Sequence, residues 1–125
     1  MFAGWLSLNT RSPIPAYRPL DPGTVRRSVE LVLILGTLFL LDIATTQVII
    51  HLGGVELNPL MAGIVANPAL HLGIKGAILL IVFLMSLVAE QRVKGSGVVF
   101  YCVLISLYTC VVANNICVLL PQIPW

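Results

Sequence analysis

Charged side chains are scarce in this sequence: lysine, arginine, aspartate and glutamate make up only 10% of its 125 residues. Hydrophobic residues make up 58%, and the mean hydropathy is +1.02. Because soluble domains carry about 25% charged residues, this composition argues against a water-soluble globule. The few basic residues are not interleaved with aromatic residues on a polar face, so we predict no nucleic-acid partner.

Common catalytic motifs are missing as well. The sequence has no His-Glu-x-x-His run, no Gly-x-Ser-x-Gly elbow and no glycine-rich phosphate loop after a strand. The only conceivable metal set is His51, His71, Glu56 and Asp42, whose spacing matches no established metal motif. We therefore predict no bound metal, no cofactor and no catalytic residues, and we interpret the two histidines as residues of the membrane interface.

Cysteines are few and gathered in one place. Cys102, Cys110 and Cys117 all fall in the last hydrophobic stretch. Residues seven or eight positions apart on one helix cannot approach closely enough to form a disulfide. We interpret these three cysteines as small packing residues.

Long apolar stretches are what the sequence does contain. Three of them, over residues 28–52, 69–90 and 98–120, have the roughly 20 residues that a membrane span requires. Asn58-Pro59 supplies an N-cap and a first helical position, which predicts a short helix over residues 59–65. The predicted fold is all-α: an integral membrane bundle of three transmembrane helices, with a short helix in the loop between the first and the second.

Basic residues predict how this bundle lies in the membrane. The loop over residues 53–68 contains no lysine or arginine, whereas six basic residues flank the other side: Arg11, Arg18, Arg26, Arg27, Arg92 and Lys94. Cytoplasmic loops carry the excess of such residues. We therefore expect a cytoplasmic Pro/Arg-rich segment over residues 1–27, a transmembrane domain over residues 28–125, and a C-terminus on the outer side.

Several polar residues interrupt the apolar pattern. An unpaired charge at the centre of a bilayer costs at least about 2.5 to 3.5 kcal/mol, so such residues face the bundle and find partners. At about 1.5 Å per residue, Asp42 lies about 15 Å, Lys75 about 8 Å and Asn114 about 9 Å below the outer ends of their spans. The predicted polar cluster is Asp42, Thr45, Thr46, Glu56, Asn58, Lys75 and Asn114.

Small residues line one face of the second and of the third span. Because small side chains let membrane helices approach closely, we expect both faces to pack within a compact bundle. They are Gly73, Gly76 and Ala77 in the second span, and Ser106, Thr109, Cys110, Ala113 and Cys117 in the third.

Residues 30–118 resemble a family of short prokaryotic integral membrane proteins catalogued as a domain of unknown function. The resemblance is carried by Leu41-Asp42-Ile43-Ala44-Thr45-Thr46, by Gly53-Gly54-Val55-Glu56-Leu57-Asn58-Pro59-Leu60-Met61, by Lys75, and by Asn114 or Asn115. Glu56-x-Asn58-Pro59 is its most specific part. The resemblance implies a small helical bundle in a prokaryotic cell membrane, and it brings no reaction, ligand or cofactor.

The polar cluster has two interpretations. In the first, Asp42 and Lys75 form a buried ion pair that fixes the helix register, while Glu56 and Asn58 cap and anchor the loop. In the second, Glu56 reaches toward Lys75 and Asp42 and builds a polar pocket open to the outside, where a small ligand, ion or proton is handled.

The two interpretations of the polar cluster lead to two hypotheses about function. The leading hypothesis is an assembly or accessory module that associates with itself or with a larger membrane complex in the lipid bilayer. The alternative is an outward-facing site for transport or an intramembrane enzyme, built on Asp42, Glu56, Lys75 and Asn114. The apolar cytoplasmic halves of the spans argue against a continuous path across the membrane.

Overall fold

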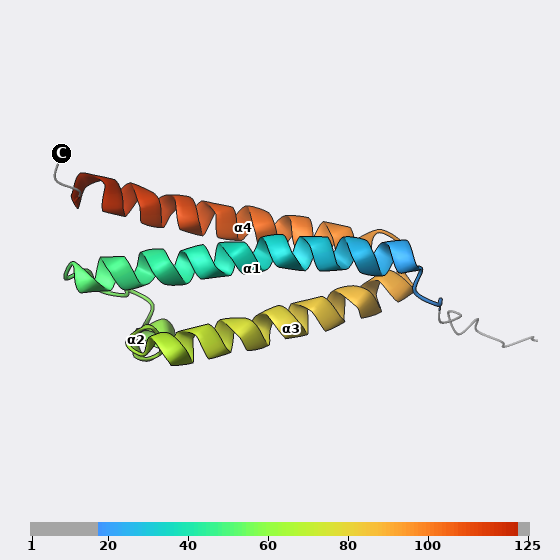
Figure 1. The fold of residues 1–125 in the computed structure, drawn as a ribbon, viewed down its shortest axis with the longest axis horizontal. Helices are drawn as coiled ribbons and strands as arrows, with labels where there is room; N and C mark the ends of the chain where they lie inside the picture. Colours follow the sequence, from blue (N-terminus) through green and yellow to red (C-terminus); the bar gives the residue numbers. More distant parts are fainter. Residues whose placement is uncertain (1–17, 123–125) are drawn as a thin grey trace, which may run out of the picture.

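Three long helices run the length of the molecule in the computed structural model, which describes residues 18–122 (Figure 1). They are α1 (Pro22–His51), α3 (Pro68–Arg92) and α4 (Ser96–Leu119), the last continued by the short 3-10 turn η1 (Leu120–Gln122). The short helix α2 (Pro59–Val65) lies between α1 and α3. All three long helices are long and apolar enough to cross a membrane. The predicted all-α fold is confirmed, and the chain is a multi-pass membrane protein.

Helix α1 begins earlier than the predicted residue 28. Asp21 is its N-cap, accepting a 3.1 Å hydrogen bond from the Gly23 N–H, and Pro22 occupies the first helical position. At about 1.5 Å per residue this helix exceeds the ~30 Å hydrocarbon core, so its first turns extend beyond the core. Arg26 therefore lies on the helix, paired with Glu30 at 3.0 Å. Residues 1–17, including most of the predicted Pro/Arg-rich segment, lie outside the described residues.

The short helix α2 has the predicted bounds and the predicted cap. The Asn58 side chain accepts a 3.1 Å hydrogen bond from the Leu60 N–H, and Pro59 follows the cap. Asn67 caps α3 in the same way, accepting hydrogen bonds from Ala69 and Leu70. Two Asn-Pro pairs thus define both helix starts, because asparagine satisfies the free N–H groups of the first turn.

Helix α1 packs along α4 and, less extensively, along α3. The buried core is Leu35, Phe39, Val82 and Tyr101. Toward α2, helix α3 diverges from the other two, so the bundle is closed at the α3–α4 turn and open at the α2 end (Figure 1). The open end is where the predicted polar residues lie.

The expected packing of the small-residue faces within the bundle is wrong. A Cβ added at Gly73 or Gly76 would meet nothing within 4 Å. The small residues of α4, from Ser106 to Cys117, are exposed as well. The physical reason lies on the opposite face of α4, where Tyr101 and Tyr108 pack against α1 and its neighbours and bring more contact area than small side chains offer.

A carboxylate fastens the closed end of the bundle. Glu90, near the end of α3, accepts hydrogen bonds from the backbone N–H groups of Gly95 at 2.8 Å and Gly97 at 3.0 Å. Gly95 adopts a φ of +88°, which favours glycine, and a Cβ at Gly97 would lie 3.0 Å from the Ser86 carbonyl oxygen. Glu90 thus takes the place of an N-cap side chain for α4, whose own N-cap is a glycine.

We expect Glu90→Ala to destabilise the protein by about 1 to 2 kcal/mol, because two backbone donors at the start of α4 lose a charged acceptor. Reversible unfolding in mixed micelles measures this change. Glu30→Ala is the matched control: it removes the exposed Arg26–Glu30 pair and should cost less than about 1 kcal/mol. Equal losses in the two variants would contradict the capping role of Glu90.

Candidate functional site: a buried polar cluster

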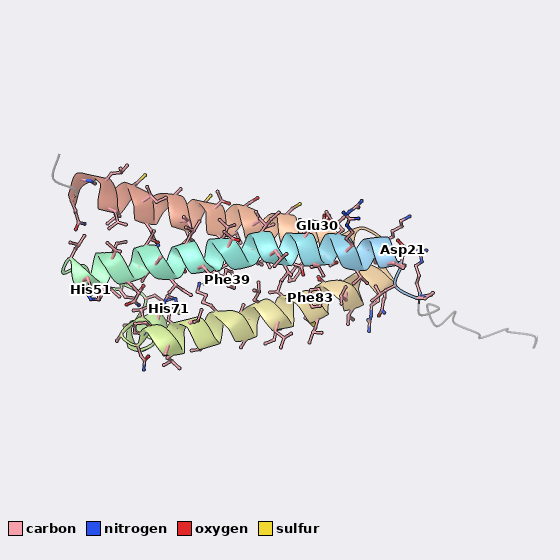
Figure 2. All side chains as sticks on the ribbon, viewed as in Figure 1. Asp21, Glu30, Phe39, His51, His71 and Phe83 are labelled. Atoms are coloured by element: carbon pink, nitrogen blue, oxygen red, sulfur yellow. The ribbon has the colours of Figure 1, made fainter. Side chains whose placement is uncertain are left out.

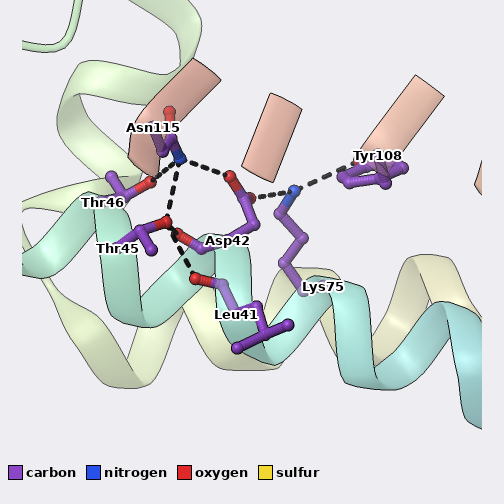
Figure 3. A network of polar contacts seen from close by, with 7 residues as sticks. All are labelled: Leu41, Asp42, Thr45, Thr46, Lys75, Tyr108 and Asn115. Carbon is purple, nitrogen blue, oxygen red and sulfur yellow. Dashed lines mark hydrogen bonds and ion pairs between the residues drawn. The ribbon is translucent and has the colours of Figure 1, made fainter. Parts of the chain in front are cut away.

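An ion pair joins α1 and α3 inside the bundle (Figure 3). Asp42 Oδ2 lies 2.9 Å from Lys75 Nζ, and the two side chains are 9% and 8% exposed. A pair this deep in an apolar medium needs further hydrogen bonds to offset the loss of water around both charges. The structure provides them from the third long helix.

Helix α4 completes the pair with an amide and a phenol (Figure 3). Asn115 donates from Nδ2 to Asp42 Oδ1 at 3.2 Å, and the same nitrogen lies 3.0 Å from Thr45 Oγ1 and 3.4 Å from Thr46 Oγ1. Lys75 donates to the Tyr108 hydroxyl at 3.2 Å. The amide that contacts Asp42 is therefore that of Asn115. The predicted cluster member Asn114 lies beside it and, with Thr46 and Glu56, lines an adjoining pocket.

Aromatic rings enclose the ammonium group on its other sides. Lys75 Nζ lies 4.9 Å from the centre of the Phe39 ring and 4.5 Å from that of Tyr108. The two rings contact each other with their centres 4.4 Å apart. Ring faces attract a cation, most strongly where water is excluded. Lys75 is thus held by one carboxylate, one hydroxyl and two rings.

The loop after α1 brings Glu56 and Asn58 to the edge of this cluster. Glu56 Oε1 accepts a 2.9 Å hydrogen bond from the Asn58 N–H, so the carboxylate supports the turn that leads into α2. Gln47 on α1 donates from Nε2 to the Val65 carbonyl at 2.8 Å and ties α2 to α1. The capping interpretation of the Glu56-x-Asn58-Pro59 motif matches this geometry.

The same residues also line a pocket of about 310 Å³ beside the ion pair. It is walled by all four described helices and the loop before α2: Asp42, Thr46, Glu56, Asn58, Met61, Val65, His71, Lys75, Tyr108 and Val111. Asn58 is exposed and Glu56 half-buried, so the pocket is reached from the loop side. An adjoining pocket of about 340 Å³ on the other side of Glu56 contains Asn114 and Asn115. Five of the seven predicted cluster residues line the first pocket.

The two histidines, both predicted at the membrane interface, differ in their exposure. Figure 2 shows His51 at the end of α1 and His71 near the start of α3. His51 is exposed, whereas His71 is 1% exposed and lines the pocket. Neither of its ring nitrogens has a hydrogen-bond partner among the described residues. A buried polar group without a partner is uncommon in folded proteins and calls for an explanation. Among residues 18–122, no three histidine, cysteine, aspartate or glutamate side chains are grouped as metal ligands.

Three members of the site were missed from the sequence: Phe39, Tyr108 and Asn115 as the amide partner. The sequence contains a pattern that could have identified two of them, Tyr108 and Asn115. Together with Tyr101 they are spaced seven residues apart. Seven residues are close to two helical turns, so these side chains share one face of α4. That spacing favours Asn115 over its neighbour Asn114, which points off this face.

Most of the chain matches a known protein family. A model described as "Domain of unknown function (DUF5658)" matches residues 33–121, which include the whole polar cluster. No curated protein and no solved structure matches the chain.

The ion pair makes a prediction for paired substitutions. We expect Asp42→Asn or Lys75→Met alone to destabilise the protein by about 3 to 5 kcal/mol, because each leaves one buried charge without its partner. The double variant should be closer to the wild type than either single variant. Unfolding in mixed micelles and cellular accumulation measure this difference. Additive losses in the double variant would show that the two charges do not depend on each other.

Proposed function

The chain belongs to the DUF5658 family, and we propose that it acts as an assembly or accessory module of a membrane complex. In this proposal the polar cluster fixes how the three spans pack, and an outer face of the bundle binds a partner. That partner is a second copy of the chain or another membrane protein.

The observation that carries this proposal is the closure of the ion pair by the chain's own side chains. Asp42 binds Lys75 and Asn115, and Lys75 binds Tyr108 in addition. These four side chains come from three helices, so forming the pair aligns all three in one register. Buried polar groups are best attested in such a specifying role. A charge that already has its hydrogen-bond partners within the chain is better suited to holding the helices together than to taking part in a reaction.

The uncovered small-residue face of α4 supports the assembly part. Cys102, Ser106, Thr109, Cys110, Ala113 and Cys117 follow one another along the exposed side of the helix, away from α1. Lipid chains are as apolar as leucine, so membrane helices associate through close packing, which small residues permit. The hydroxyls of Ser106 and Thr109 donate to carbonyl oxygens of the same helix, at 2.8 Å and 2.7 Å, so they do not require a partner from a second helix.

We further propose that the open end of the bundle faces outward. The start of α1 and the α3–α4 turn lie at the same end, where Arg18 and Lys94 line a common pocket. Figure 2 shows Asp21 and Glu30 at this end, and His51 and His71 at the other. Lysine and arginine mark cytoplasmic ends. A prokaryotic cell membrane, with the N-terminus inside and the C-terminus outside, fits this distribution.

A second candidate function is favoured by His71. Its enclosed, unpartnered ring on the wall of the 310 Å³ pocket supports an outward-facing site for a small ligand. Unlike the assembly proposal, this candidate requires a partly accessible pocket beside the ion pair. It also requires that Glu56 and His71 are free to bind the ligand.

Assembly is tested on the α4 face. If close packing of this face holds the complex, Ala113→Leu should weaken self-association or partner binding roughly tenfold or more, because a leucine keeps the helices apart. Cross-linking and native mass spectrometry in mild detergent measure it. Ala44→Leu, the same change at an exposed position of α1 outside both small-residue faces, is the control and should have no effect. A strictly monomeric, partner-free wild type would overturn the assembly proposal.

The orientation is tested with reporter fusions to the C-terminus. We expect alkaline phosphatase fused there to be active, since this enzyme folds only outside the cytoplasm, and green fluorescent protein fused there to stay dark after export. A fluorescent fusion without phosphatase activity would place the open end, and the pocket, on the cytoplasmic side.

A further inference from the structure

We propose that the pocket beside His71 binds an ammonium group, carried by a small amine or by the headgroup of an aminolipid. The inference rests on the second candidate function above and names the chemistry of its ligand. Its parts are a buried ring without a partner, one uncompensated negative charge, and a cavity of about 310 Å³ that contains both.

The buried imidazole ring of His71 is the first feature that indicates a ligand. His71 is 1% exposed, and both of its nitrogens lack a partner among the described residues. A neutral imidazole presents one N–H donor and one lone pair. Two other polar side chains that line this pocket are engaged elsewhere: Lys75 with Asp42 and Tyr108, and the Asn58 side-chain oxygen with the first turn of α2. His71 is thus available to a bound molecule.

The charge of the pocket selects a cation. Asp42 and Lys75 neutralise each other at 2.9 Å. Within residues 18–122, Glu56 has no ion-pair partner, and its hydrogen bond comes from the neighbouring Asn58 N–H to one carboxylate oxygen. One negative charge therefore remains at the mouth of the pocket. An anion such as phosphate would lie against two carboxylates, whereas a cation would be attracted to Glu56.

The arrangement of acceptors favours an ammonium over a metal ion. An ammonium group has three N–H donors, and the pocket offers the second oxygen of Glu56, the lone pair of a neutral His71 and the hydroxyl oxygen of Thr46. A zinc ion takes three or more carboxylate, imidazole or thiolate ligands, and no such group of three is found among the described residues.

The position of the pocket allows two sources of this ligand. His71 lies in the first turn of α3, about 4.5 Å along the helix from Pro68 at ~1.5 Å per residue, so the pocket is near the end of the span. Lipid headgroups lie at that level, and small amines reach it from water. The chemistry that recognises the ligand is the same for both.

The whole chain contains two histidines, so a histidine-specific isotope label can report directly on ligand binding at His71. The full-length protein, labelled with ¹⁵N-histidine and held in a non-ionic detergent at fixed pH, gives imidazole signals from His51 and His71 alone, and His51→Gln assigns them. Ethanolamine is the amine probe, and phosphate and Zn²⁺ are the comparison probes. The lipid source is tested in nanodiscs of phosphatidylglycerol with and without phosphatidylethanolamine.

The proposal predicts a saturable shift of the His71 signal with ethanolamine or with phosphatidylethanolamine, while the exposed His51 stays unchanged. Response to ethanolamine alone identifies a free amine, and response only in the nanodiscs identifies the lipid. A saturable response to phosphate or Zn²⁺ without one to either amine overturns the ammonium assignment and leaves a ligand site. Silence toward every probe overturns the ligand site as well, and leaves the assembly proposal untouched.

A pair of charge-removing variants completes the test. Glu56→Gln keeps an acceptor for the Asn58 N–H, so the loop retains its turn. It should weaken amine binding roughly tenfold or more, because one charge-assisted hydrogen bond becomes neutral. Glu30→Gln removes the same charge from the exposed, opposite end of α1 and should bind like the wild type. Equal affinity of Glu56→Gln and the wild type overturns the proposal.

Discussion

A carboxylate and an ammonium group cannot remain apart inside a membrane, because each alone costs several kcal/mol to remove from water. Asp42 and Lys75 reach each other from α1 and α3, and Asn115 and Tyr108 satisfy them from α4. The rest of the bundle depends on this arrangement. Rotation or sliding of any one span would break the pair or strip it of a hydrogen bond, so the polar cluster favours the same register as the aromatic packing of Tyr101 and Tyr108.

The two ends of the bundle differ in how they are held. At the closed end, Glu90 joins the turn to α4, and the Ser86 and Tyr101 hydroxyls lie 3.0 Å apart between α3 and α4. At the open end, α3 diverges, α2 lies beside the start of α3, and the loop before α2 crosses over from the end of α1 (Figure 1). A pocket forms there because short polar side chains and a seven-residue helix cannot fill the gap. The same divergence that creates the pocket leaves His71 without a partner.

Much of the fold and part of the site could be predicted from the sequence. Spans follow from apolar length, and α2 follows from Asn58-Pro59, because both signals are local. Depth along the helices placed Asp42 and Lys75 together, since an uncompensated charge must find its opposite. Tyr108 and the choice between Asn114 and Asn115 could not be derived in this way. They depend on how α4 is rotated about its axis, which the bulky tyrosines decide through packing.

Three membrane spans, the short helix after the first of them, and a small set of polar residues near one end follow from the sequence alone. Length, hydropathy and capping residues suffice for this, because each acts within a few neighbouring positions. Which helix faces meet depends on the tertiary structure. It turned the small residues of α4 outward, brought Asn115 to the ion pair and enclosed His71. Those outcomes come from competition among contacts far apart in the chain, where aromatic packing and charge pairing outweigh the close approach that small residues allow.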